Sequence, residues 1–217
     1  MDASTDRPRV VAVVPIGTLE GAKSRLGETL DAEERRDLAT RLARRTITAV
    51  LATPGIDETI VVTPDDEVRQ LAADLGARPI RQHGQGLNQG LREGREDVVA
   101  AGADALVVIP TDLPLVSSDA IGQLLRQLDG SARPLVVIVP DRHGRGTNAL
   151  LLAPPNAIEF CFGGDSRAAH VECARSRGAS IVQLDGALTL DLDTPDDLLL
   201  MERLAPEVIV GQTADAR

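Results

Sequence analysis

Short runs of β-branched and aliphatic residues alternate along the chain with segments of helical periodicity, which is typical of parallel strands joined by helical crossovers. Residues 105–110, ALVVIP, are almost entirely apolar, as expected for a central strand covered on both faces. Similar runs predict strands at 9–16, 60–63, 78–82, 135–140 and 180–185, with a further apolar run at 147–153. The pattern predicts an α/β fold with a mostly parallel central sheet and helices on both faces.

Cap residues bound several of the predicted helices. Asp31, followed three residues later by Glu34, forms a capping-box pattern that opens a long helix to about residue 53. The dipeptide at 63–64, Thr-Pro, is expected to cap a helix that runs to residue 75, and Thr194 to cap a last helix that ends near residue 204.

Composition is consistent with one domain at residues 9–204, between a flexible N-terminus at 1–8 and a loose tail at 205–217. With no Trp or Tyr and two Phe among 217 residues, the core must be aliphatic. A net charge of −10 disfavours binding to nucleic acid or to an anionic membrane surface. Two cysteines, no signal peptide and no membrane-length apolar run favour a reduced, cytoplasmic setting.

Candidate chemistry gathers where the predicted strands end. Ligands of open parallel sheets lie beyond the carboxyl ends of the strands. The segments PIGTLEGAKSRL, HGQGLN and TDLP each follow a predicted strand, and DLD precedes the last helix. This coincidence predicts a ligand site at one edge of the sheet.

The loop PIGTLEGAKSRL differs from a Walker phosphate-binding loop, because Gly17 and Gly21 are one residue too close and Ala22 separates Gly21 from Lys23. Lys23 is nevertheless the only lysine in the chain, and Arg25 follows two residues later. Both cations are therefore predicted to contact phosphate. A nicotinamide dehydrogenase is disfavoured, since no GxGxxG follows the first strand.

Three aspartates suggest a metal site. In extended chain, Asp191 and Asp193 project to one face while Leu190 and Leu192 face the core. Together with Asp112 from TDLP they would form an all-oxygen site suited to Mg²⁺ or Mn²⁺, although Asp112 alone could simply satisfy a turn. The three histidines lack metal-ligand spacing, and loop or surface roles are expected for them.

The segments PIGTLEGAKSRL, VIPTDLPL, TNALLL, FGGDS and DLDTPDDL, in this order, resemble the guanylyltransferases of deazaflavin coenzyme F-420 biosynthesis. The resemblance covers essentially the whole predicted domain, and it implies the single-domain, Rossmann-like nucleotide-diphospho-sugar transferase fold that molybdenum-cofactor guanylyltransferases share. It also implies transfer of GMP from GTP to phosphoenolpyruvate, which gives enolpyruvoyl-2-diphospho-5'-guanosine and pyrophosphate. The product would pass to a downstream transferase.

The resemblance also implies roles for particular residues. The positions that match Mg²⁺-binding carboxylates are Asp112, Asp191 and Asp193. The positions that match acceptor-binding residues are Thr147, Gly163 and Ser166. The positions that match the loop over the triphosphate are Lys23 and Arg25. The expected catalytic residues are Lys23, Arg25 and Asp112.

Nucleotide contacts are expected from Gly17 and Lys23, and, from their place at a strand end, from Gly86 and Asn88, although Asn88 could equally be a turn or cap residue. One departure from the family pattern is Gly164, which stands where many members carry Pro. Its neighbour Asp165 would repel an anionic acceptor unless it turns away to cap the following helix.

Other acceptors fit the same sequence pattern. The archaeal members of the family use 2-phospho-L-lactate, and 3-phosphoglycerate, a sugar phosphate or the molybdenum cofactor are further possible acceptors. A non-catalytic nucleotide-sensing module is the alternative from another class, and the three convergent carboxylates argue against it.

Overall fold

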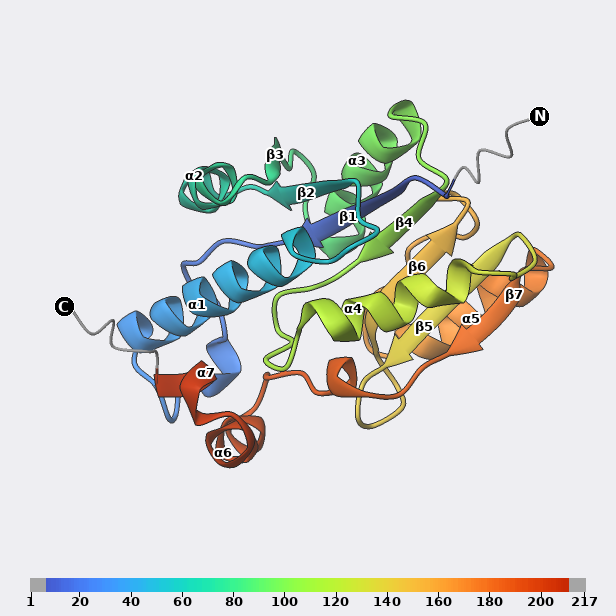
Figure 1. Ribbon diagram of the computed structural model, residues 1–217. Coiled ribbons are helices and arrows are strands. Elements are labelled where there is room, and N and C mark those ends of the chain that lie inside the picture. The colour runs from blue at the N-terminus through green and yellow to red at the C-terminus, as the bar shows by residue number, and fades with distance from the viewer. Residues whose placement is uncertain (1–6, 211–217) are drawn as a thin grey trace.

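Seven strands form one sheet in the order β3-β2-β1-β4-β6-β5-β7 in a computed structural model that describes residues 7–210 (Figure 1). The strands are β1 (Val10–Pro15), β2 (Glu58–Thr63), β3 (Arg78–Arg81), β4 (Ala105–Val108), β5 (Leu135–Pro140), β6 (Thr147–Ala153) and β7 (Ser180–Gln183). All neighbouring pairs are parallel except those made by β6, which runs antiparallel to β4 and β5. The predicted mostly parallel α/β sheet is confirmed.

The reversed direction of β6 determines which residues reach the ligand edge of the sheet. Val108, the last residue of β4, pairs with Leu150 inside β6. Because β6 runs the other way, its first residue, Thr147, lies beyond the end of β4 rather than beside the start of β4. Thr147 also pairs with Pro140, the last residue of β5.

Helices cover both faces of the sheet, as predicted (Figure 1). One face packs against α1 (Ala32–Leu51), α2 (Asp66–Leu75) and α4 (Ser118–Leu125), and the other against α3 (Leu87–Ala100) and α5 (Ser166–Ser176). No helix within residues 7–210 combines the length and the apolar character needed to cross a membrane.

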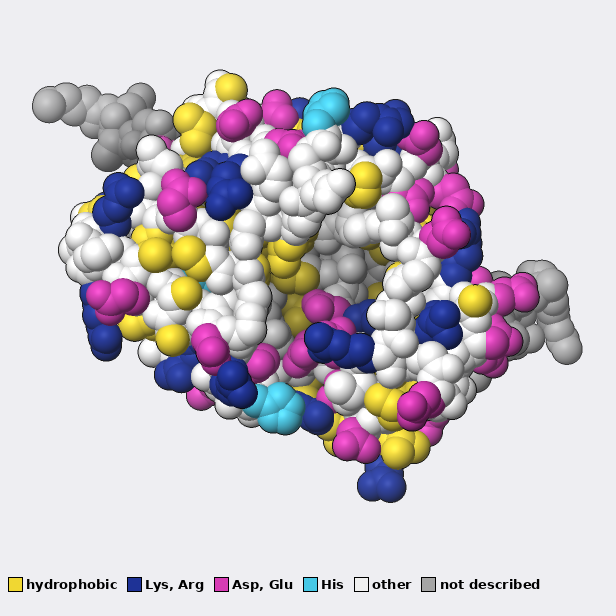
Figure 2. Space-filling model, turned by 180° about the vertical axis from the view of Figure 1, so that it is seen from behind, with side chains coloured by type: hydrophobic (Ala, Val, Ile, Leu, Met, Phe, Trp, Pro, Cys, Tyr) yellow, Lys and Arg dark blue, Asp and Glu magenta, His cyan; other side chains and the backbone are white. Residues whose placement is uncertain are grey.

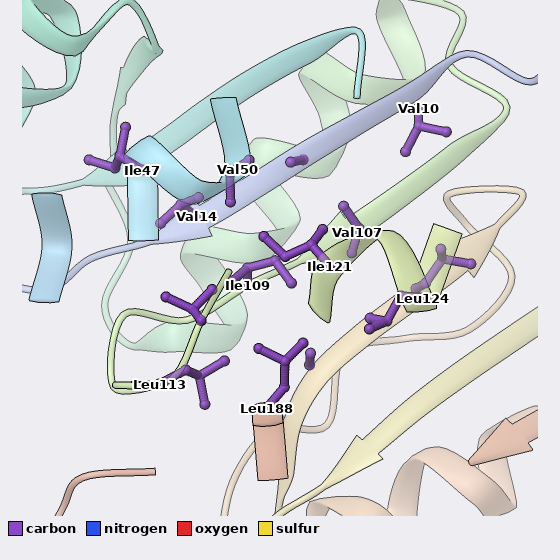
Figure 3. Packing of buried hydrophobic residues seen from close by; sticks show 14 of the residues in the cluster. Val10, Val14, Ile47, Val50, Val107, Ile109, Leu113, Ile121, Leu124 and Leu188 are labelled. Atoms are coloured by element: carbon purple, nitrogen blue, oxygen red, sulfur yellow. The ribbon is translucent and has the colours of Figure 1, made fainter. Parts of the chain in front are cut away.

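The central strand β1 is buried on both faces. Val10, Ala12 and Val14 contribute to the cluster under α1 and α4, whereas Val11 and Val13 contribute to the cluster under α3. Figure 3 shows the first cluster, in which side chains from the two helices meet those of β1 and β4. Each such valine contributes roughly 1.5–3 kcal/mol of burial free energy. The strand therefore serves as a rigid base for the loop that follows it.

Helix α3 approaches the sheet unusually closely at Gly94. A Cβ atom on Gly94 would lie 2.8 Å from a methyl carbon of Val62 and 3.1 Å from one of Val13. Such distances are too short for a side chain, so glycine is required for this contact.

The predicted caps are confirmed for two helices and wrong for one. Asp31 and Glu34 form the capping box of α1. Thr194 caps α6 (Pro195–Leu204), with Asp197 as its capping-box partner. Helix α2 is capped by Asp65 rather than by the preceding Thr-Pro. The Asp65 carboxylate accepts hydrogen bonds from two backbone N–H groups of the first turn, whereas Thr63 is the last residue of β2.

Part of the predicted tail is structured. Residues Pro206–Val210 form a short helix, α7, and Ala205 and Val208 are buried with Leu38 and Leu42 of α1. The description of 205–217 as loose is therefore wrong for the first six of these residues. The rest of that tail and residues 1–6 of the predicted flexible N-terminus lie outside the described residues.

Candidate functional site

Segments from distant parts of the chain meet at the carboxyl edge of the sheet. The Leu192 backbone N–H donates to the carbonyl oxygen of Asp112 at 2.8 Å, which joins the DLD segment to the chain that follows β4. Leu192 and Leu26 are fully buried in one apolar cluster, which holds the loop after β1 against the same segment. The predicted inward orientation of Leu192 is thus confirmed, whereas Leu190 is only partly buried.

Lys23 lies at the centre of this junction. Its Nζ donates to the carbonyl oxygen of Leu192 at 2.6 Å and lies 3.1 Å from Asp193 Oδ1. Its backbone is left-handed, with φ 52° and ψ 37°, just before the short helical turn Ser24–Leu26. A non-glycine residue in this conformation costs about 1 kcal/mol or more, and such strain concentrates at functional sites.

Arg25 makes a weaker contact with the same carboxylate. Its Nη1 lies 3.4 Å from Asp193 Oδ2, and its side chain is 74% exposed. The two predicted phosphate-binding cations are therefore brought together, and in this structure both pair with Asp193.

Asp112 and Asp191 carry poorly compensated negative charge. Burial, followed by the charges of Asp193 and Asp191, raises the pKa of Asp112, although Lys23 opposes the shift. Burial and the neighbouring Asp193 likewise raise the pKa of Asp191. These are the electrostatic conditions that a bound cation relieves.

The predicted metal site is only partly assembled. Within residues 7–210, no three acidic, histidine or cysteine side chains lie close enough together to hold a metal ion. Asp193 forms ion pairs with Lys23 and Arg25. The all-oxygen set and the uncompensated charge of Asp112 and Asp191 still fit Mg²⁺ or Mn²⁺, and the ligand role of the three aspartates stays a prediction.

Asp197 holds the turn that carries the metal-ligand candidates, and the sequence reading missed it. It is 4% exposed, and its Oδ2 accepts from the backbone N–H groups of Asp193 and Thr194 and from the Thr194 hydroxyl. Arg142 pairs with its other oxygen at 2.6 Å. These bonds lower the pKa of Asp197 despite its burial. The signal in the sequence was Thr-x-x-Asp, a capping-box spacing.

The predicted acceptor residues lie around the start of α5. Ser166 is its first residue and is 3% exposed, and Thr147 at the start of β6 is 8% exposed. Gly163 has a φ of 147°, a conformation that favours glycine. Asp165 makes no side-chain cap bond and instead pairs with Arg145 at 3.0 Å, so an ion pair rather than a helix cap engages its carboxylate.

His170 joins two parts of this acceptor region, in contrast to the loop or surface role expected for it. The ring is fully buried. Its Nδ1 lies 3.0 Å from Thr147 Oγ1, and its Nε2 accepts from the backbone N–H of Cys161 at 3.0 Å. The available signal was the spacing of Ser166, His170 and Ala174, which share the buried face of α5.

The predicted nucleotide residues fall into two places. Gly17 and Lys23 line a cavity of about 200 Å³ between the loop after β1 and helix α1. Gly86 precedes α3 with a φ of 83°. Asn88 bonds the backbone of Phe162 through both ends of its amide, at 2.9 Å each, so its predicted contact with guanine stays a prediction while its observed role is to hold this loop.

Figure 2 shows a hollow near the middle of one face of the protein, with apolar side chains inside it and acidic and basic side chains side by side along its lower edge.

Another cavity, about 330 Å³, is larger than the one beside Gly17 and Lys23. It is lined by Val10, Pro54 and Asp129 among others and therefore lies at the start of β1, the opposite edge of the sheet. It contains none of the predicted site residues.

Comparisons with known proteins show the family and the fold of the chain. A family model described as "Guanylyl transferase CofC like" matches residues 10–203. A phosphoenolpyruvate guanylyltransferase of Sphaerobacter thermophilus is 43% identical, covering 94% of this chain and 97% of that protein. A 2-phospho-L-lactate guanylyltransferase of Methanothermobacter thermautotrophicus is 32% identical, covering 88% of this chain and 82% of that protein.

Solved structures share the fold at low sequence identity. A putative nucleotide-diphospho-sugar transferase from Desulfovibrio desulfuricans superposes with a TM-score of 0.72 at 19% identity, covering 90% of this chain and 87% of the other. A glucosyl-3-phosphoglycerate synthase from Mycobacterium tuberculosis, crystallised with Mn²⁺, uridine diphosphate and phosphoglyceric acid, gives 0.58 at 16% identity over 93% and 77% of the two chains. With the family match over nearly the whole domain, the chain belongs to the CofC-like guanylyl transferase family and is a nucleotidyltransferase.

Proposed function

We propose that the protein transfers GMP from GTP to the phosphate of phosphoenolpyruvate. An oxygen of the acceptor phosphate attacks the α-phosphorus of GTP, the bond between that phosphorus and the bridging oxygen to the β-phosphorus breaks, and pyrophosphate leaves with the electron pair. The supporting observation is the gathering of Asp112 and Asp191 beside Lys23 at the carboxyl edge of the sheet. The 43% identical relative carries the name of this activity.

The reaction requires no dedicated general base. The second pKa of a phosphate monoester is about 6, so the attacking oxygen is already largely ionised at neutral pH. The tasks left to the protein are to bring two anionic substrates together and to balance the charge that develops on the leaving group. The acidic and basic side chains of this edge are suited to those tasks.

Asp112, Asp191 and Asp193 would hold the divalent cation, with Asp193 released from its ion pairs. A bound Mg²⁺ supplies charge neutralisation at the reacting phosphates. Lys23 and Arg25 would then contact the phosphates that leave as pyrophosphate. In the structure, Lys23 and Arg25 pair with Asp193, which keeps these charges compensated.

The carboxylate of the acceptor would bind between Thr147 and the start of α5. The helix has 11 residues, and the positive end of its dipole favours an anion, although the backbone N–H groups of Ser166 and Arg167 already donate to carbonyl oxygens of Gly163 and Arg145. Ser166 and the backbone of Gly163 would donate to the carboxylate. The ion pair between Asp165 and Arg145 lessens the repulsion that Asp165 would otherwise exert.

Pyrophosphate release tests this proposal. The purified protein is given Mg²⁺ and GTP with phosphoenolpyruvate, 2-phospho-L-lactate or 3-phosphoglycerate separately, and the downstream transferase is added to consume the product. We expect release with phosphoenolpyruvate. Silence with all three acceptors, despite GTP binding, would refute the proposal and favour another acceptor or a nucleotide sensor.

A carboxylate pair serves as the internal control. Asp112→Asn should lower kcat by about 100-fold or more because it removes the negative charge of a carboxylate proposed to hold the divalent cation. Asp129→Asn changes an exposed carboxylate beside the cavity at the opposite edge of the sheet and should leave kcat unchanged. Equal rates for the two variants would remove Asp112 from the site.

A second acceptor has specific support. The archaeal relative at 32% identity is named for 2-phospho-L-lactate, which has the same carboxylate and phosphate as phosphoenolpyruvate on a saturated carbon. Release with 2-phospho-L-lactate at a higher kcat/KM than with phosphoenolpyruvate would assign this substrate instead.

A further inference from the structure

We propose that His170 is a positioning residue for the acceptor, which fixes the Thr147 hydroxyl as a hydrogen-bond donor and anchors the chain that leads to Gly163. The inference rests on the proposed function, because it takes Thr147 and Gly163 as acceptor contacts. His170 itself touches no substrate position and is fully buried beneath the site.

The bond to Cys161 fixes the tautomer of the ring. A backbone N–H can only donate, so Nε2 of His170, 3.0 Å from the Cys161 nitrogen, must present a lone pair. The proton of the neutral ring is therefore on Nδ1, which faces Thr147 Oγ1 at 3.0 Å. Burial alone lowers the pKa of His170 to about 4, which keeps the ring neutral at physiological pH.

This tautomer gives the Thr147 hydroxyl a direction. Because Nδ1–H donates to the hydroxyl oxygen, the hydrogen of that hydroxyl stays available for another acceptor. An anionic group placed beside Thr147 would then receive a hydrogen bond. With the opposite tautomer, the Thr147 hydroxyl would instead donate its hydrogen to Nδ1 of the ring.

The second contact of His170 secures the loop before α5. Cys161 is held by the ring, and the next residue, Phe162, is held at both its N–H and its carbonyl by the Asn88 amide. The Phe162 ring also meets the His170 ring edge-on, with centroids 4.9 Å apart and planes at 73°. The backbone that enters Gly163 is therefore fixed from both sides, and His170 is the group that connects it to Thr147.

Two substitutions separate the hydrogen bond of Nδ1 to Thr147 from that of Nε2 to Cys161. The amide of Asn occupies the place of Nδ1, so His170→Asn keeps a partner for Thr147 and loses the bond to Cys161. The longer Gln places its amide near Nε2, so His170→Gln keeps the acceptor for Cys161 and leaves Thr147 without a donor. We expect His170→Gln to raise the KM for phosphoenolpyruvate by up to about tenfold, because the Thr147 hydroxyl stays but loses its orientation; about tenfold is the typical loss for one hydrogen bond to a charged group. The KM for GTP should stay within about twofold, since the nucleotide contacts are untouched.

A double-mutant cycle with Thr147→Val decides whether His170 acts through Thr147. If it does, His170→Gln should add little to the acceptor KM once the hydroxyl is gone. Additive effects, or an equal rise in both KM values, would overturn the inference and leave His170 as a core residue that only stabilises the fold.

A measurement on the unmodified protein guards against variants that fail to fold. The chain has three histidines, so a ¹⁵N-histidine NMR spectrum contains few signals. We expect the signals of His170 to report an unprotonated Nε2 and a protonated Nδ1, and the reverse would overturn the inference. Wild-type silence with every acceptor would overturn the proposed function, whereas wild-type turnover with an additive cycle would overturn the role of His170 alone.

Discussion

Acidification should destabilise the protein through His170. The ring is fully buried, and its pKa falls from 6.5 to about 4 because burial disfavours the charged form. Protonation would also place a hydrogen on Nε2, so that two hydrogen-bond donors, Nε2–H and the Cys161 N–H, would face each other. Between pH 6.5 and pH 4, His170 is mostly protonated in the unfolded chain and mostly neutral in the folded protein. Lowering the pH over this range therefore favours unfolding.

The magnitude follows from the shift. One pKa unit corresponds to about 1.4 kcal/mol, so the full effect is about 3 kcal/mol. The stabilising contribution is complete above pH 6.5 and is lost as the pH falls toward 4. At pH 5 the loss should already be about 2 kcal/mol, a large part of the 5–15 kcal/mol that is typical of a folded domain, by order of magnitude.

Urea unfolding at pH 7.5, 6 and 5 measures this loss for the wild type, His170→Gln and His83→Gln. His83 serves as the control, since its side chain is 79% exposed. Other groups with shifted pKa values, among them Asp112, Asp191 and Asp197, titrate in all three proteins and cancel in the differences. The advantage of the wild type over His170→Gln should shrink by about 2 kcal/mol between pH 7.5 and pH 5. A constant difference between these two proteins would refute the reasoning.

Three further predictions concern the loop, the helices and the turn. Acylation of Lys23, the only lysine, should be slowed by GTP, and peptide mass spectrometry measures this, with the N-terminal amine as the internal reference. Gly94→Ala should lower the free energy of unfolding by about 1–3 kcal/mol, because its Cβ would lie 2.8 Å from a side-chain carbon of β2. The control Gly122→Ala on α4 would meet only the tip of an arginine side chain at 3.5 Å and should raise the free energy of unfolding by up to about 1 kcal/mol. Asp197→Ala should cost about 2 kcal/mol or more in urea unfolding, since it removes a cap and leaves Arg142 unpaired, while the exposed Asp196→Ala should cost about 0.5 kcal/mol or less.

Local patterns were enough to predict the sheet and the edge at which the candidate residues gather. The apolar runs of β1 and β4 and the Asp31 capping box are signals contained within a few residues, and each is found where it was predicted. The convergence of Lys23 with the DLD segment follows from the general rule that loops after parallel strands share one edge.

Competing partners explain where the sequence reading of the site fell short. Asp193 was expected to act with Asp112 and Asp191 as a metal ligand, and that role stays a prediction, but its ion pairs with Lys23 and Arg25 were not foreseen. Asp165 was expected to repel the acceptor unless it capped α5, but a guanidinium from the loop between β5 and β6 pairs with it instead. Both outcomes depend on cations that are distant in sequence, and spacing alone carries no information about such cations.

The acceptor region shows a deeper limit, which lies in strand direction. The run TNALLLA predicts a buried strand equally well in either orientation. Only because β6 is antiparallel does Thr147 lie at the edge where β4 and β5 end, within reach of His170, 23 residues later. In a parallel β6 the same threonine would start at the opposite edge, and the buried imidazole would lose its partner. The role of His170 is therefore set by topology, and a buried histidine on a helix can be interpreted only once the neighbouring strand has a direction.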